Sequence, residues 1–341
     1  MKMFKSWGNN HNSRLLPALL LSTLLLFAVF LFSLNSGLIS LSPSEVIHTL
    51  LGFGSTDSKI VLFDIRLPRI VIAMLVGAGF ALSGAIMQGV SQNALADPGI
   101  LGINAGAGLA VVLYIAYFYE KIQYAPVFAL PIIAFLGAAA AALIVFALAY
   151  KNGRISPIRL ILVGIAAGAG FNAVMLFLTY RMNAYSYDFV KIWMSGSVWG
   201  TNWQYVLASV IWLALLTPHA IYKAHRINML NLGDELSTGL GVAVLKERII
   251  VMAIAVGLAG SCTAVAGSIG FIGLIAPHVA RKWVGVNYKR VLPTSALLGA
   301  ILVLLADTIG RIIVQPVEIP VGIVTAAIGA PYFLYLLIRK A

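Results

Sequence analysis

Side chains capable of chemistry are concentrated in three segments of this 341-residue sequence. Two arginines stand three residues apart, and so on one face of a helix, in RLPR (66–69). Side chains able to cap exposed backbone groups surround a proline and several glycines in QGVSQNALADPGILG (88–102), which is either an ordinary turn or part of a gate. The third segment is amphipathic and broken twice by glycine: INMLNLGDELSTGLGV (227–242). It is either a solvated connector or a segment that docks into a cleft on a partner.

Catalytic constellations are missing from the sequence. There is no G-x-x-x-x-G-K-[ST] loop, so we do not expect the chain to bind and hydrolyse ATP by the P-loop route. The H-E-x-x-H, G-x-S-x-G and paired-carboxylate patterns are missing too, and the five histidines favour structural roles. A single cysteine, Cys262, excludes an intrachain disulfide and a cysteine-based zinc site. We therefore expect no catalytic residue, no cofactor and no bound metal.

The composition indicates a membrane protein. Hydrophobic residues make up 61% of the chain, charged residues only 10%, and the mean hydropathy is +0.97. A water-soluble domain carries about 25% charged residues. Several apolar runs reach the roughly 20 residues that a helix needs to cross a bilayer, and they are solid rather than alternating. The fold class predicted is all-α, a polytopic transmembrane helical bundle.

About ten spans are predicted, within a single transmembrane domain that covers residues 1–341. Each is an apolar run bounded by polar residues, glycine or proline, and the run at 270–284 is the shortest. The predicted spans are 15–34, 61–85, 100–118, 127–150, 158–180, 203–222, 248–268, 270–284, 295–313 and 321–338.

The formal net charge of +12 is explained by topology rather than by nucleic-acid binding. Lysines and arginines gather in the loops that a bacterial membrane protein keeps inside the cell. No basic face interleaved with aromatic residues accompanies them, so no nucleic acid is expected as a partner. The predicted protein is multi-pass in the bacterial cytoplasmic membrane. The lysine and arginine counts place the N-terminus in the cytoplasm, and an even number of spans then returns the C-terminus to the same side.

Ionisable side chains within the predicted spans are rare. Only Asp64 and Asp307 are carboxylates there, and Asp307 stands four residues before Arg311, the favourable spacing for a helical ion pair. A proton-driven carrier would place such groups at mid-membrane, so energy is expected to come from elsewhere. An arginine at the bilayer centre costs about 2.5–3.5 kcal/mol. Arg66 and Arg69 are therefore expected with exposed guanidiniums at the outer interface, where lipid anchoring and a functional role are equally good interpretations.

From about residue 60 to the end, the sequence resembles the FecCD/BtuC-type permeases of siderophore, haem and cobalamin ABC importers. One departure is Ala94, because the family usually reads N-P-L-A at this turn. The resemblance implies the permease fold of type II ABC importers. Besides RLPR, it is carried by GAGFALSGAIMQGVSQNALADPGILGINAGA (77–107), NMLNLGDELSTGLG (228–241), GSIGFIGLIAPHVAR (267–281), LPTSALLGAILVLLADTIGR (292–311) and EIPVGIVTAAIGAPYFLYLL (318–337).

The resemblance also implies three sets of site residues. Those expected to dock the two acidic lobes of a substrate-binding protein are Arg66, Arg69 and Arg311. Those expected to contact the ATPase subunits, in a cytoplasmic coupling loop at about 223–248, are Leu232, Gly233, Asp234 and Glu235. Those expected at the inner gate are Asn93, Leu95, Ser156, Pro157 and Ile158.

The function implied is transport of an iron(III)–siderophore complex across the cytoplasmic membrane, with ATP hydrolysed by a partner subunit. The implied partners are two copies of an ABC ATPase, a second permease that is identical or different, and an extracytoplasmic substrate-binding protein. Membrane lipid surrounds the bundle. Haem and cobalamin are the alternative substrates. An ion-coupled secondary carrier and a membrane-embedded enzyme are the alternative classes of protein.

Overall fold

The computed structural model describes residues 2–37, 42–118, 129–151 and 154–340. Within these ranges the regular secondary structure is helical apart from one pair of two-residue strands. The elements, in chain order, are α1 (Lys2–Asn35), α2 (Pro43–Leu50), α3 (Thr56–Lys59), the π-helix η1 (Ile60–Arg66), α4 (Leu67–Ser91), α5 (Ile103–Phe118), α6 (Ala129–Ala149), β1 (Tyr150–Lys151), β2 (Arg154–Ile155), α7 (Pro157–Thr179), α8 (Ala184–Met194), α9 (Trp203–Leu230), α10 (Asp234–Gly239), α11 (Val244–Ala266), α12 (Ile272–Val284), α13 (Tyr288–Ile312) and α14 (Val321–Lys340).

The predicted helical bundle is confirmed, and each predicted span has a helix at its position. Within the described part of the chain, seven helices are long and apolar enough to cross a membrane. Two shorter apolar helices, 103–118 and 321–335, and the 13-residue helix α12 occupy the positions of the other three predicted spans. The first two residues of the predicted span 127–150 lie outside the described residues.

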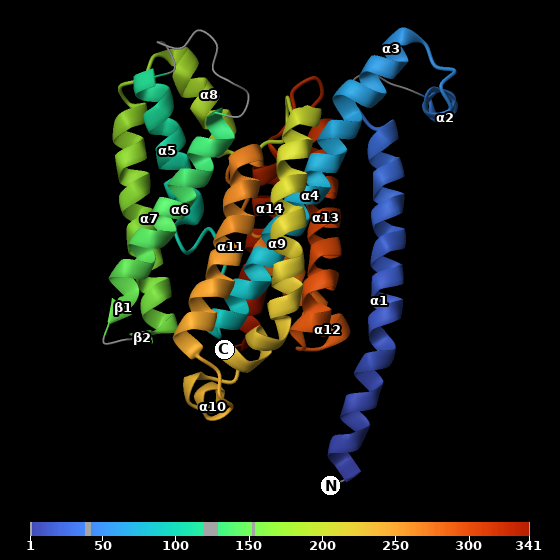
Figure 1. The fold of residues 1–341 in the computed structure, drawn as a ribbon. Helices are drawn as coiled ribbons and strands as arrows, with labels where there is room; N and C mark the ends of the chain where they lie inside the picture. Colours follow the sequence, from blue (N-terminus) through green and yellow to red (C-terminus); the bar gives the residue numbers. More distant parts are fainter. Residues whose placement is uncertain (1, 38–41, 119–128, 152–153, 341) are drawn as a thin grey trace.

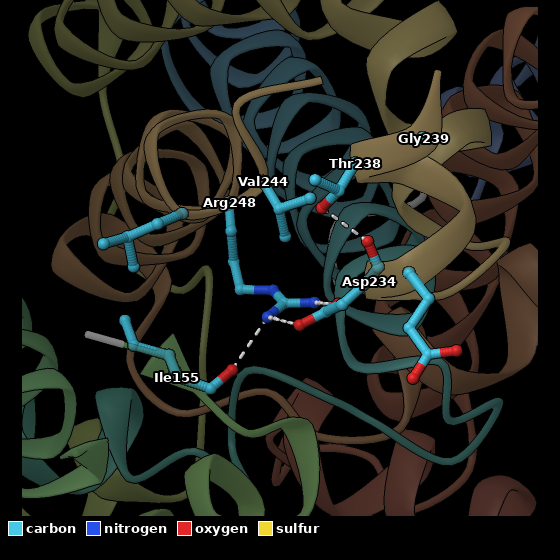
Figure 2. Close-up of a pocket in the computed structure, with 8 residues that line it drawn as sticks. Ile155, Asp234, Thr238, Gly239, Val244 and Arg248 are labelled. Atoms are coloured by element: carbon cyan, nitrogen blue, oxygen red, sulfur yellow. Dashed lines mark hydrogen bonds and ion pairs between the residues drawn. The ribbon is translucent and has the colours of Figure 1, made fainter. Parts of the chain in front are cut away.

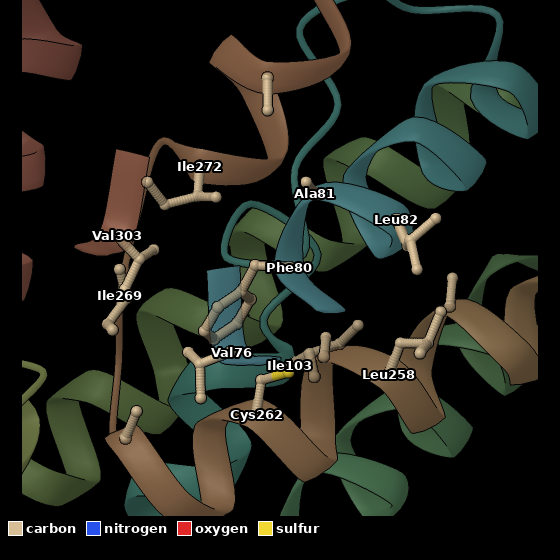
Figure 3. Packing of buried hydrophobic residues seen from close by; sticks show 14 of the residues in the cluster. Val76, Phe80, Ala81, Leu82, Ile103, Leu258, Cys262, Ile269, Ile272 and Val303 are labelled. Atoms are coloured by element: carbon tan, nitrogen blue, oxygen red, sulfur yellow. The ribbon is translucent and has the colours of Figure 1, made fainter. Parts of the chain in front are cut away.

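Helix α4 is the centre of the bundle (Figure 1). It and α11 are buried over most of their length by other helices, whereas the apolar faces of α1, α7 and α9 are largely exposed. Such an arrangement suits a bundle whose outer surface meets lipid. Figure 3 shows Val76 and Phe80 of α4 near Cys262 of α11. The cysteine is thus a buried packing residue.

Glycines allow α4 to touch its neighbours through the backbone. A Cβ atom on Gly77 would overlap the carbonyl group of Gly299 in α13, and one on Gly84 would overlap the backbone of Gly273 in α12. Small residues at such crossings are the usual means by which membrane helices approach closely. They fix the position of α4 relative to both partners.

The short elements lie at the two ends of the bundle (Figure 1). Helix α10, the β1–β2 hairpin and both chain termini lie at one end, called here the α10 end. Helices α2, α3 and α8 lie at the opposite end, called here the arginine end because it holds Arg66, Arg69 and Arg311. The sequence analysis did not predict α2, α3, α8 or the hairpin. Two termini at one end agree with an even number of crossings.

The glycine contact between α4 and α13 yields a first prediction. Replacing Gly77 with alanine should destabilise the protein by about 1–3 kcal/mol, because overpacking forces two backbones apart. Gly170→Ala in α7 is the matched control, since its new methyl group would meet open space. Thermal unfolding of the detergent-purified chain measures both. Equal melting temperatures for the two variants would contradict the proposed role of this contact.

Candidate functional site

The three predicted docking arginines come together around one cavity at the arginine end. Arg66 ends η1, Arg69 lies in the first turn of α4, and Arg311 lies in the last turn of α13. The cavity has a volume of about 460 Å³, and Asp64 and Glu318 also line it. Residues far apart in the sequence therefore form one charged site.

Arg69 belongs to a buried ion-pair network whose centre is Asp307. Arg69 Nη2 lies 2.8 Å from Oδ1 of Asp307, and Arg69 Nη1 lies 2.8 Å from Oε2 of Glu318. Arg311 Nε lies 3.1 Å from Oδ2 of Asp307, which confirms the predicted pair within α13. The carboxylate of Asp307 is fully buried between the two guanidiniums. The sequence analysis missed Glu318 and the pairing of Arg69.

The end of α1 covers the other two guanidiniums. Arg66 Nη1 donates to the carbonyl oxygen of Leu34, and Arg311 Nη1 donates to the carbonyl oxygen of Ser36 at 2.8 Å. Arg311 Nη2 also donates to Ser33 Oγ at 2.6 Å. Carbonyl groups at a helix C-terminus lack helical partners, so they attract such donors. The expectation of exposed guanidiniums is therefore wrong for Arg66, which is 4% exposed, and for Arg69, whose side chain is 11% exposed. Arg311 is buried as well, at 3%.

At the α10 end, a short helix projects from the bundle between two glycines. Gly233 has φ of +101° and Gly241 has φ of +79°, conformations that favour glycine. Helix α9 continues to Leu230 and α11 begins at Val244, so the connection is shorter than the predicted 223–248 loop. Three exposed leucines spaced four apart form what is called here the α10 leucine stripe: Leu232, Leu236 and Leu240. Only the first of them was predicted as a site residue.

Two predicted coupling residues differ in their accessibility. Glu235 is exposed, whereas the carboxylate of Asp234 is held by Arg248 of α11 (Figure 2). Arg248 Nη2 donates to Asp234 Oδ1 at 2.7 Å, and its Nη1 donates to the carbonyl oxygen of Ile155 at 2.8 Å. Asp234 is therefore committed to an internal contact. Arg248 was predicted at the boundary between the inner loop and the span 248–268, and it is a buried residue of helix α11.

The two predicted gate segments lie in different surroundings. Asn93 Oδ1 accepts from the backbone of Leu95 at 2.9 Å, and Leu95 packs beside Leu274 and Ile275 of α12. Ala94, which stands between Asn93 and Leu95, occupies the position where the family usually has proline. At the start of α7, Ser156 is the N-cap residue, Pro157 occupies the first turn and Ile158 is exposed.

The predicted capping by the polar turn at 88–102 is confirmed. Gln88 Nε2 donates to the carbonyl oxygen of Gly273 at 2.9 Å, and Gln92 Nε2 donates to that of Leu230 at 3.0 Å. Asp97 Oδ1 accepts from the backbone of Gly99 at 2.8 Å. These side chains join the turn to α9 and α12.

Metal-binding clusters were also sought among the described residues. No group of three or more histidine, cysteine, aspartate or glutamate side chains there could hold a metal ion. His219 Nδ1 lies 2.7 Å from the carbonyl oxygen of Leu215 in its own helix, and the His278 ring meets Tyr332 edge-on at 5.9 Å. Both contacts are structural.

An apolar helical bundle with polar segments at both ends has the architecture of a membrane transport protein. Residues 24–339 match the FecCD transport family, and the chain belongs to that family. This membership confirms the family expected from the sequence motifs.

Similar proteins cover almost the whole chain. It is 49% identical over 319 residues to the iron(3+)-hydroxamate import system permease protein FhuG of Bacillus subtilis, covering 93% of this chain and 95% of the relative. It is 38% identical to the hemin transport system permease protein HmuU of Yersinia pestis, covering 96% and 98%. A solved structure of an inward-facing metal-chelate type ABC transporter matches with a TM-score of 0.82 and 31% identity, covering 94% and 98%.

The buried network at the arginine end yields a second prediction. Asp307→Asn should lower stability by about 3–5 kcal/mol, because removing one partner leaves buried charges uncompensated. Glu318→Gln is the control: its side chain is partly exposed and Arg69 keeps Asp307, so the loss should be about 1 kcal/mol or less. Thermal unfolding of the purified variants measures the difference. Equal losses would show that Asp307 is not the centre of the network.

Proposed function

We propose that this chain is the membrane-spanning permease subunit of a binding-protein-dependent ABC importer for ferric siderophores. The observation that carries the proposal is the FecCD match over residues 24–339, combined with a polar site at each end of the bundle. The 49% identity to a hydroxamate permease favours that substrate class. Haem is the second candidate, supported by the 38% identity to a hemin permease.

The proposed orientation places the α10 end in the cytoplasm. Both termini lie at this end, and so do Lys223, Arg226 and Lys246, in agreement with the excess of basic residues on cytoplasmic sides. The membrane is proposed to be the bacterial cytoplasmic membrane, where a periplasmic or surface-anchored binding protein meets the arginine end.

A second permease is proposed to complete the pathway. In the described part of the chain, side chains around α4 fill the middle of the bundle, so the protein alone offers a packed core rather than a conduit. The pathway is therefore proposed to run between two permeases, identical or different. The gate is assigned to Asn93 and Leu95 and to Ser156, Pro157 and Ile158.

An ATPase dimer is proposed to bind the α10 leucine stripe together with Gly233 and Glu235. Isolated exposed leucines are ordinary, but these three lie close together in sequence on a projecting segment, with Leu236 in α10 and the other two just outside it. A projecting segment with several exposed apolar side chains is suited to a groove on a partner. The chain needs such a partner because its sequence contains no P-loop of its own.

An ion-coupled mechanism is a weaker alternative. Among the described residues, the buried carboxylates are Asp97 and Asp307. Asp307 is paired with two arginines, and Asp97 accepts a backbone hydrogen bond within its turn. Neither is placed as an open relay for protons across the bilayer.

Uptake by reconstituted vesicles tests the proposed function. The permease pair, its ATPase and its binding protein should accumulate a radio-iron-labelled ferric hydroxamate only when ATP is supplied on the α10 side. Leu236→Asp should abolish this uptake and the co-purification of the ATPase, because a carboxylate cannot enter an apolar groove unpaired. Leu236→Met at the same position should preserve both. Accumulation by the permease alone under an ion gradient would refute the proposal.

Docking at the arginine end yields a prediction of opposite changes in affinity for two variants. Arg66→Glu with Arg69→Glu should weaken binding of the substrate-binding protein by roughly tenfold or more at low salt, because charge reversal repels its acidic lobes. Glu318→Gln should strengthen binding, because it frees Nη1 of Arg69 for an incoming carboxylate.

Affinity of the purified binding protein, measured at low and high salt, checks both signs. Because Arg69 also joins α4 to α13, the double variant requires a parallel thermal unfolding measurement. The glutamine variant removes no arginine and keeps both ion pairs of Asp307, so it tests docking with the buried part of the network in place. Unchanged affinity in both variants at low salt would exclude this site as the docking surface.

A further inference from the structure

Arg248 occupies a junction between three segments of the chain. It is the fifth residue of α11 and is 2% exposed. Its Nη2 donates to the carboxylate of Asp234, the first residue of α10. Its Nη1 donates both to that carboxylate and to the carbonyl oxygen of Ile155. Ile155 ends strand β2, and the next residue is the N-cap of α7. Figure 2 shows the guanidinium between these two acceptors.

Other polar contacts join α10 to α9, and α9 to α11. Ser237 Oγ donates to the carbonyl oxygen of Met229 at 2.7 Å, which joins α10 to the end of α9. Lys223 Nζ lies 2.8 Å from Oε2 of Glu247, which joins α9 to α11. Helices α9, α10 and α11 are thus linked to one another at this end. Arg248 connects that group to β2 and hence to the start of α7.

We infer that Arg248 is a positioning residue that transmits a displacement of α10 to the start of α7, where the gate residues Ser156, Pro157 and Ile158 lie. The inference rests on the proposed function, because the displacement is supplied by the ATPase dimer at the α10 leucine stripe. Arg248 itself touches neither the ATPase nor the substrate.

The shape of the guanidinium explains why arginine serves here. Its planar fork presents several donors in fixed directions, so one side chain can hold a carboxylate and a backbone carbonyl at a set distance. A cavity of about 470 Å³, lined by Asp234, Glu235, Thr238, Val244 and Ile155, adjoins the pair. Asp234 is partly exposed at this cavity, whereas the arginine is buried. The carboxylate can therefore follow α10 while the buried guanidinium carries the motion inward.

The test uses the complete complex in vesicles and measures uptake per ATP hydrolysed. Arg248→Met should keep the ATPase bound and active but lower uptake per ATP by about tenfold, the usual scale of coupling between two sites. Arg248→Lys keeps the charge but not the fork, so it should recover part of the loss. Lys246→Met is the control: this exposed lysine lies two residues away and should leave the ratio unchanged.

Asp234→Asn tests the same link from the exposed side, and it serves alone if the methionine variant fails to fold. It should lower uptake per ATP, because it removes the charge that holds the guanidinium of Arg248. If Arg248→Met folds, adding Asp234→Asn to it should cause no further loss, because the ion pair is already lost. Wild-type uptake per ATP in Arg248→Met, or in Arg248→Lys and Asp234→Asn if the first does not fold, would overturn the inference. So would a parallel fall of uptake and hydrolysis, which indicates a purely structural role. A wild-type complex without ATP-driven uptake would instead refute the proposed function.

Discussion

Backbone contact between helices is the constraint on which the rest of this structure depends. Lipid provides no hydrophobic drive between helices and no partners for polar groups, so membrane helices associate by close packing. Helix α4 meets α13 at Gly77 and α12 at Gly84, where even a methyl group would overlap backbone. Because α4 is held in this way along its length, Arg69 at its start and Gln88 near its end are fixed at opposite ends of the bundle.

A buried arginine that joins two segments of the chain is present at each end of the bundle. Arg311 bonds a carboxylate and a backbone carbonyl from another segment, and Arg248 does likewise. Buried ion pairs contribute less to stability than their short distances suggest, because desolvation offsets the attraction. We interpret these two as fixing one segment relative to another. Apolar packing alone tolerates more variation in position.

Interactions that are local in sequence were predictable, and those that depend on the fold were not. The apolar runs predict the spans, and four-residue spacing predicts the pair of Asp307 and Arg311. Arg69 pairs with the same aspartate across 238 positions, a contact that periodicity cannot reveal. The hairpin had a usable signal that the analysis overlooked, because two residues, Asn-Gly, separate its strands. Arg248 was predicted at the very start of a span rather than inside it, because helix ends cannot be placed within a turn from sequence.

The two ends differ in what a partner must displace. At the arginine end, Arg69 is already paired with Glu318. An incoming carboxylate must replace that pair, so the binding free energy is only the difference between the new contact and the old one. On the proposed function, the affinity of that carboxylate is therefore modest. The exposed leucines near α10 gain the full contribution of burial, about 25 cal/mol per Å². On the proposed function, the first arrangement suits a binding protein that leaves in every cycle, and the second suits an ATPase that stays.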